Sequence, residues 1–267
     1  MSMSSIAALG SYCRAICAWC CTPIWMKFRR WAVTRPPPRR RCPMDDITGL
    51  AIFDLDDTLL EGDATGLWTD WLIAKGWIAD GEEYRAIWAQ QMLDYAAGQL
   101  DMEVHLTHLL APLAGRAVSE VDAEVARFLD AELMPRLYRE GLERIHWHRA
   151  QNHQVVIISA STAHLVAPLA ERLALDAALA TALETEQSYY NGRACGIRTF
   201  REGKLAALKA WQQQHASHSA GLPSWGYSDS RNDLALLEFV DHPFAVHPDP
   251  TLASLAQQRA WQTLRWQ

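Results

Sequence analysis

The chain has 267 residues, 49% of them apolar and 21% charged, which suits one large packed domain with or without a smaller inserted one. Its formal net charge of −6 combines eight cations and no acids in residues 1–44 with a charge of −14 in the remainder. A body this acidic argues against nucleic-acid binding, which depends on Lys and Arg to neutralise phosphates.

Residues 1–44 differ from the rest in composition and hold five of the six cysteines. Their apolar stretch, 15–26, is shorter than the roughly 20 residues of a membrane-spanning helix, and most positive charges follow it, the reverse of a secretory signal. Cys17 and Cys20 have a zinc-compatible spacing, but no His or second pair accompanies them. We interpret 1–44 as a basic, Cys-rich extension that is disordered or lies upstream of the true start. Interfacial membrane attachment remains the alternative.

The body that follows contains one cysteine, Cys195. A single cysteine in more than 200 residues is typical of a reducing compartment and gives no disulfide framework. We therefore expect a cytoplasmic protein that has no membrane partner.

Short apolar runs predict the strands of a central sheet. They lie at residues 50–53, 155–158, 178–183, 225–227 and 244–246. Continuous apolar runs separated by helical patterns are typical of parallel strands that are covered on both faces. We therefore expect an α/β fold built on a parallel sheet.

About 100 residues separate the first two runs, which is too many for one crossover helix. Residues 65–137 have helical periodicity, interrupted by glycines, and predict an inserted helical domain. A helix at 135–151 is expected to return the chain to the core, which would comprise 45–64 and 138–267. Within that core, Asn191-Gly192 predicts the type I′ turn of a hairpin.

Three acids, Asp54, Asp56 and Asp57, follow the first apolar run in the stretch FDLDDTLL. Acids at a strand end are often simple turn formers, but ligands of open α/β sheets also bind at the carboxyl ends of strands. Asp229 and Asp233 follow another apolar run in the same way. Two acid clusters at two strand ends predict a shared site for a hard cation such as Mg²⁺.

Two further segments carry polar groups suited to phosphate. Ser159 and Ala160 follow the second apolar run, where a hydroxyl and backbone N–H groups suit an oxyanion; an ordinary helix N-cap by Ser161 or Thr162 is the alternative. Lys204 begins a helix and is either a solvated surface lysine or a cation beside the phosphate.

The segments FDLDDTLL, IISAS, GK and YSDSRNDLALL, in this order, resemble the four motifs of the haloacid dehalogenase superfamily of phosphohydrolases. The helical insertion after the first motif is similar to the C1-capped branch, subfamily IB, which includes phosphoserine phosphatase. The resemblance covers about residues 50–248. It implies a Rossmannoid parallel sheet, a helical C1 cap and phosphatase activity.

The resemblance also implies the chemical roles. Asp54 would be the nucleophile that forms an aspartyl-phosphate, and Asp56 would act as general acid and then base. Mg²⁺ would be held by the Asp54 side chain, the Asp56 carbonyl and Asp229. Ser159 and the Ala160 N–H would hold the phosphate.

The resemblance gives supporting roles to four more residues. Lys204 would offset the charge of Asp54 and the phosphate. Asp233 would orient Lys204 or a metal-bound water, and Asn232 would support the phosphate pocket. Thr58 would hydrogen-bond within its own loop, whereas Asp57 would face away.

The substrate is expected to be a small phosphorylated metabolite. Motif two reads Ser-Ala-Ser where phosphoserine phosphatases usually have Ser-Gly-Gly, while Asp63 matches in position the acid that contacts their substrate's amine. The third motif, Phe-Arg-Glu-Gly-Lys, is similar to a bacterial subgroup that includes histidinol-phosphate phosphatases. Histidinol phosphate or a phosphoserine-like substrate is therefore favoured, and Trp68, Tyr84 and Arg85 are candidates for the pocket wall or for cap packing.

Two alternatives stay open: a lipid phosphatase of the phosphatidylglycerophosphate type and a catalytically silent module on the same fold. Their tests are membrane fractionation and hydrolysis of a simple phosphoester. The sequence does not indicate the oligomeric state.

Overall fold

The computed structural model describes residues 47–214 and 221–267, all of them within one compact unit, Asp45–Gln267. The expectation for residues 1–44 lies outside the described part of the chain. Within that part, no helix is long and apolar enough to cross a membrane.

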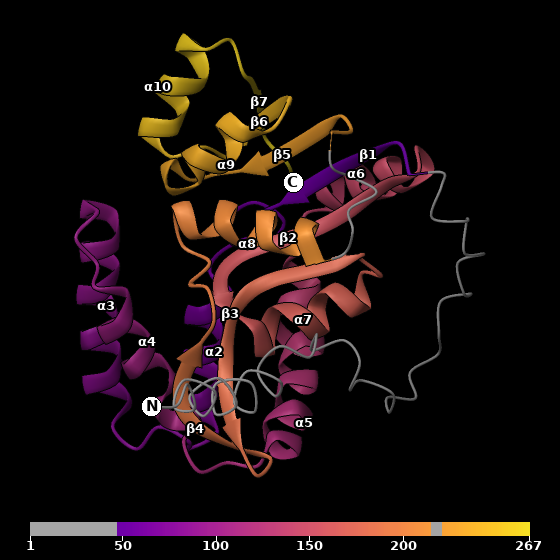
Figure 1. Ribbon diagram of the computed structural model, residues 1–267. Coiled ribbons are helices and arrows are strands. Elements are labelled where there is room, and N and C mark those ends of the chain that lie inside the picture. The colour runs from indigo at the N-terminus through magenta and orange to yellow at the C-terminus, as the bar shows by residue number, and fades with distance from the viewer. Residues whose placement is uncertain (1–46, 215–220) are drawn as a thin grey trace, which may run out of the picture. The chain divides into compact units, whose positions relative to one another are not determined.

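The unit is built on a seven-stranded sheet (Figure 1). Its strands are β1 Gly49–Phe53, β2 His153–Thr162, β3 Ala177–Glu186, β4 Tyr189–Cys195, β5 Ser224–Ser228, β6 His242–Val246 and β7 Gln262–Leu264. Their order is β4-β3-β2-β1-β5-β6-β7, and every neighbouring pair is parallel except the hairpin of β3 and β4. The predicted parallel α/β sheet is therefore confirmed. Each of the five apolar runs lies within a strand.

Both faces of the sheet are covered, because β1 alternates its side chains between two cores. Leu50 and Ile52 pack in a cluster with residues of α8 (Glu202–Gln214) and α9 (Leu234–Phe239). Ala51 and Phe53 face the larger cluster. That cluster includes residues of α6 (Arg139–Ala150) and α7 (Ala163–Arg172). This double burial explains why β1 is apolar throughout.

The insertion between β1 and β2 is helical, as predicted. Its elements are α2 Ala64–Ala74, α3 Gly81–Ala97, α4 Met102–Leu110, η3 Ala111–Leu113, α5 Val118–Phe128, η4 Leu129–Leu133 and η5 Met134–Arg136. Asp63, Asp80 and Asp101 begin α2, α3 and α4 by accepting backbone N–H groups of the first turn. The predicted helix at 135–151 begins later, at Arg139, because Leu137 and Tyr138 are extended.

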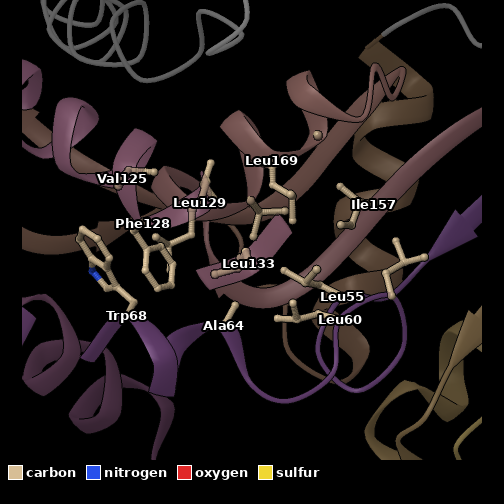
Figure 2. Close-up of a cluster of buried hydrophobic side chains, with 14 of the residues drawn as sticks. Leu55, Leu60, Ala64, Trp68, Val125, Phe128, Leu129, Leu133, Ile157 and Leu169 are labelled. Carbon is tan, nitrogen blue, oxygen red and sulfur yellow. The ribbon is translucent and has the colours of Figure 1, made fainter. Parts of the chain in front are cut away.

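The insertion and the sheet share one hydrophobic core (Figure 2). Ile157 of β2 and Leu169 of α7 belong to the same buried cluster as Trp68 of α2 and Phe128 of α5, whose rings lie 5.0 Å apart. Trp68 is 1% exposed, so it packs the core and does not line an open pocket. This shared core fixes the insertion to the sheet near β2.

The β3–β4 hairpin also connects the two parts, but its turn is not the predicted one. The turn lies at Gln187 and Ser188, both with positive φ, whereas Asn191-Gly192 lies inside β4 where the strand register shifts. Glycine is favoured at 192 because its φ is +78°, which strains other residues, and because a Cβ would also lie 3.1 Å from the Ala114 Cβ of the insertion. Backbone hydrogen bonds join Tyr190 to the insertion, and Figure 1 shows the hairpin reaching the level of its helices.

Candidate active site

Two predicted acids meet at the carboxyl ends of adjacent strands. The chain leaves β1 toward β2 on one side and returns as β5 on the other, which makes this edge a topological switch point. Asp54 follows β1 directly, and its N–H donates to the Tyr227 carbonyl in β5 (3.0 Å). Asp229 follows β5 directly. The sheet order thus brings motifs 175 residues apart to one edge.

Lys204, the first inward-facing residue of α8, joins two of the acids. Its Nζ lies 2.7 Å from Asp54 Oδ1 and 2.7 Å from Asp233 Oδ2, and all three residues are buried. Burial disfavours the ammonium, but Asp233 and Asp54 outweigh it and hold the pKa of Lys204 above its usual value. Lys204 is therefore a buried counter-charge and not a solvated surface lysine.

Gly203 explains why glycine precedes this lysine. A Cβ at position 203 would lie 1.8 Å from the Arg198 carbonyl oxygen, well inside any allowed contact. Only glycine lets the start of α8 approach the preceding loop so closely. The close approach then places Lys204 against the carboxylates.

Asp56 is held by three donors from two elements, α2 and β2. Its Oδ1 accepts the Ala64 N–H (2.7 Å), and its Oδ2 accepts the hydroxyls of Ser161 (2.9 Å) and Ser159 (3.3 Å). Burial and then the nearby Asp63 raise the pKa of Asp56 to about 7, against the lowering effect of the hydrogen bonds. A carboxyl with this pKa can both give and take a proton near neutral pH.

Asp229 and Thr58 form a contact that the sequence did not predict. The Thr58 hydroxyl donates to Asp229 Oδ1 (3.2 Å) and so joins the first and fourth motifs, while the Thr58 N–H makes the expected bond within the loop, to the Leu55 carbonyl (3.2 Å). Burial, followed by repulsion from Asp54 and Asp233, raises the pKa of Asp229 to about 9. Asp57 is exposed, and its Oδ1 accepts the Gly62 N–H at the loop surface.

The end of β2 presents the proposed phosphate residues. Ser159 is fully buried, Ala160 is half-buried, and the Ser161 N–H donates to Ser159 Oγ (3.0 Å). In the helix-cap alternative, Thr162 does occupy the N-cap position of α7, but its side chain accepts no backbone N–H of the first turn. Sequence reasoning missed Ser161, although its i+2 spacing from Ser159 on one strand could have indicated it.

Two other predicted residues have structural partners beside the site. Asp63 is the N-cap of α2, where its oxygens accept the N–H groups of Thr65 (3.0 Å) and Gly66 (3.1 Å), and burial raises its pKa. Asn232 lies in the short helix η6 (Arg231–Asp233), and its Oδ1 accepts from Arg201 Nε (3.2 Å).

The inner face of α3 contributes Trp88, Gln91 and Tyr95, which sequence reasoning did not select and which are buried or half-buried on a largely exposed helix. Tyr84, a pocket candidate on the same helix, is buried and packs within the insertion, where its hydroxyl donates to the His108 carbonyl. A Cβ at Gly66 would lie 3.1 Å from Asp63 Oδ2 and 3.7 Å from Trp88 Nε1, so the indole is beside the acid. Arg85, once a pocket candidate, is exposed instead and pairs with Asp70.

The donor set can be tested for its fit to a divalent cation. Within the described ranges, no three His, Cys, Asp or Glu side chains are placed to hold a metal ion together. The predicted set needs only two carboxylates, of Asp54 and Asp229, and one backbone carbonyl. Asp233 Oδ1 is buried without a hydrogen-bond partner among the described residues. Hard oxygen donors crowded around a single lysine suit Mg²⁺.

Comparison with known proteins places this site in a family. The sequence profile of haloacid dehalogenase-like hydrolases matches residues 51–238, a range that includes every predicted site residue. A histidinol-phosphatase of Neisseria meningitidis is 32% identical over 222 residues, which cover 81% of this chain and 98% of that protein. A phosphoserine phosphatase of Mycobacterium tuberculosis is 29% identical over 231 residues, which cover 83% of this chain and 72% of that protein.

A solved structure is similar over the same range. A Bordetella pertussis protein whose function is described as unknown has a TM-score of 0.76 and is 32% identical, covering 82% of this chain and 98% of its own. The similarity therefore extends to the fold and, at this identity, to the sequence.

Proposed function

The chain belongs to the haloacid dehalogenase-like hydrolases and is a phosphatase; from this premise we propose that it hydrolyses a small, amine-bearing phosphomonoester with Mg²⁺, through an aspartyl-phosphate on Asp54. Residues 45–64 and 138–267 would be the catalytic core and 65–137 the cap. The observation that carries the proposal is the buried triad of Asp54, Lys204 and Asp233 at the switch point of the sheet.

Asp54 is suited to nucleophilic attack because Lys204, 2.7 Å from its Oδ1, favours the carboxylate form. Lys204 thereby opposes burial, which raises the pKa of Asp54 to about 7. Asp54, Asp229 and the Asp56 carbonyl would hold Mg²⁺, which when bound offsets the charge of the phosphate and the carboxylates. In the first step an Asp54 carboxylate oxygen bonds to phosphorus as the P–O ester bond breaks, and Asp56 gives its proton to the leaving oxygen.

The second step regenerates the enzyme. Asp56, now a carboxylate, takes a proton from water, whose oxygen bonds to phosphorus while the bond from phosphorus to Asp54 breaks. Inorganic phosphate leaves and both acids return to their starting states. The hydroxyls of Ser159 and Ser161 hold Asp56 in place through its Oδ2. Ser159, the Ala160 N–H and Asn232 would line the phosphate site.

The contacts of the cap support an amine without a carboxylate. Asp63 and Trp88 lie side by side, and a carboxylate next to an indole suits a protonated amine. Each arginine of the cap forms an ion pair with a carboxylate of the cap itself. The pairs are Arg85 with Asp70, Arg116 with Glu120, Arg127 with Glu124 and Arg136 with Glu132. Phosphoserine would bring a carboxylate that these arginines are not placed to meet. Histidinol phosphate, which has none, is therefore the favoured substrate.

The test is phosphate release by the full chain from histidinol phosphate, phosphoserine and p-nitrophenyl phosphate, with Mg²⁺ or with EDTA. We expect activity only with Mg²⁺ and a kcat/KM for histidinol phosphate at least about tenfold above that for phosphoserine. Asp54→Asn should lower kcat by about 10³-fold or more on every substrate. Equal rates for Asp54→Asn and the unchanged protein would refute the mechanism, and a preference for phosphoserine would refute the substrate.

A further inference from the structure

The last turn of α3 brings a tyrosine from the insertion to the ion cluster. The Tyr95 ring lies 5.4 Å from that of Phe200, in the loop that leads into α8. The charges of Lys204, Asp233 and Asp54 all act on its hydroxyl. Burial raises the pKa of Tyr95 to about 12, so it remains a phenol.

Tyr95 and Arg201 share one partner, the side-chain amide of Asn232. Arg201 Nε donates to Asn232 Oδ1 (3.2 Å), and the guanidinium of Arg201 packs over the Phe200 ring (4.8 Å). The Tyr95 hydroxyl is hydrogen-bonded to the same amide. This hydrogen bond lowers the pKa of Tyr95, as a bond donated to the phenol oxygen does, so the amide nitrogen of Asn232 is the donor. An amide nitrogen has two N–H groups, so one remains to face another acceptor.

The end of α3 is fitted to the same loop. Gly98 caps α3 in the left-handed conformation, and a Cβ there would lie 3.1 Å from Arg201 Nη2 and 3.5 Å from Arg231 Nη2. The carboxyl end of a helix carries partial negative charge, which suits contact with guanidinium groups. The seating of α3 therefore controls whether Tyr95 reaches Asn232.

We propose that Tyr95 is a positioning residue that fixes the Asn232 amide so that its second N–H points into the phosphate site. Arg201 holds the oxygen of the amide from the core, and Tyr95 holds the nitrogen from the cap. Phosphate affinity thus depends on the cap being seated. The inference rests on the proposed function only for the location of the phosphate.

The test compares two tyrosines on the same face of α3. Tyr95→Phe removes the hydroxyl but keeps the ring on Phe200. The control, Tyr84→Phe, removes a hydroxyl that donates to the His108 carbonyl (3.0 Å) within the insertion. We expect Tyr95→Phe to raise the inhibition constant of inorganic phosphate and the KM of p-nitrophenyl phosphate about 5- to 10-fold, with kcat changed less than about twofold. Tyr84→Phe should leave all three within about twofold.

A double-mutant cycle separates positioning from general packing. In an Asn232→Ala background, Tyr95→Phe should have no further effect on phosphate affinity, because the amide that it orients is gone. Arg201→Ala removes the donor to the oxygen of the Asn232 amide and should lower phosphate affinity. In the Asn232→Ala background it, too, should have no further effect. Additive effects, or an unchanged affinity in Tyr95→Phe, would overturn the proposal.

Direct binding keeps this test independent of the mechanism. Titration calorimetry with inorganic phosphate and Mg²⁺ on Asp54→Asn, with and without Tyr95→Phe, measures affinity without turnover. If Asp54→Asn proved active, the aspartyl-phosphate would fail, yet the phosphate affinities would still decide the role of Tyr95.

Discussion

Two buried polar clusters lie in the core, one made of charged groups and the other of neutral groups. In the charged cluster, Lys204 contacts Asp54 and Asp233. In the neutral cluster, His148 contacts the Tyr227 hydroxyl through Nε2 (2.8 Å) and His153 through Nδ1 (2.8 Å). Both clusters are almost completely removed from solvent. They therefore show what decides whether a buried group in this protein is charged.

The deciding factor is the partner. Burial, with additions from His153 and Arg144, lowers the pKa of His148 to about 3, so the imidazole is neutral at pH 7. Lys204 is buried as deeply but has two carboxylates at hydrogen-bond distance, which keep it charged. A buried group keeps its charge only where opposite charge offsets the lost hydration. The charged cluster lies where the chemistry needs it, at the carboxyl ends of β1 and β5.

The largest effect is expected when the charged cluster loses its counter-charge. Lys204→Met leaves Asp54 and Asp233 without their cation, and we expect the free energy of unfolding to fall by about 3–5 kcal/mol. Urea unfolding with EDTA measures this without help from metal. Lys209→Met, an exposed lysine on the same helix, is the control and should cost less than about 1 kcal/mol.

A second substitution tests the reason for that loss. Adding Asp54→Asn to Lys204→Met removes one of the stranded carboxylates and should restore part of the stability. If Lys204→Met were as stable as the unchanged protein, the lysine would not be what compensates the buried acids.

Lowering the pH tests the neutral cluster. The folded-state pKa of His148, about 3, lies below the usual 6.5, so the unfolded chain binds more protons between these values and stability falls as the pH drops. From pH 7.5 to 5.5 this imidazole should account for about 1.4 kcal/mol of lost stability. Urea unfolding at pH 7.5 and at pH 5.5 measures this drop in the free energy of unfolding. In His148→Gln the drop should be smaller than in the unchanged protein by about 1.4 kcal/mol. His146→Gln, which alters an exposed imidazole on the same helix, should behave like the unchanged protein.

The smallest effect is expected at Asp57, an exposed acid of the first motif that belongs to neither cluster. Asp57 is exposed, has a positive φ and accepts the Gly62 N–H. An asparagine can adopt the same backbone conformation and accept the same hydrogen bond. Asp57→Asn should keep phosphatase activity within about twofold and stability within about 0.5 kcal/mol. A loss comparable to that of Asp54→Asn would mean that the functional register of FDLDDTLL is misassigned.

The residues of the charged cluster were predictable because each follows or faces a strand end within a short motif. Asp54 and Asp229 could be placed at one edge of the sheet from apolar runs followed by acids, and Lys204 from the motif order. Asp56 needed only its spacing from Asp54. Their shared feature is that local sequence sets both the element and the direction of the side chain.

Other features depended on competition between distant groups. Asn191-Gly192 has the stronger turn sequence, yet the turn forms at Gln187 and Ser188 because the glycine is needed where β4 meets the insertion. The Thr58 hydroxyl bonds to Asp229, in addition to the bond that the Thr58 N–H makes within its own loop. Tyr95 could not be chosen from the other aromatic residues of the insertion, because its partner, Asn232, lies 137 residues away.

The parallel α/β sheet and the helical insertion could be predicted from local sequence, because hydrophobic period and spacing are local properties, and the acids and lysine of the site from the order of four short motifs. The partner of each group depends on the fold. Asp54 meets Lys204 across 150 residues, and Thr58 meets Asp229 across 171. Those contacts follow from β1 lying between β2 and β5, an order in which β1 is buried between two hydrophobic cores.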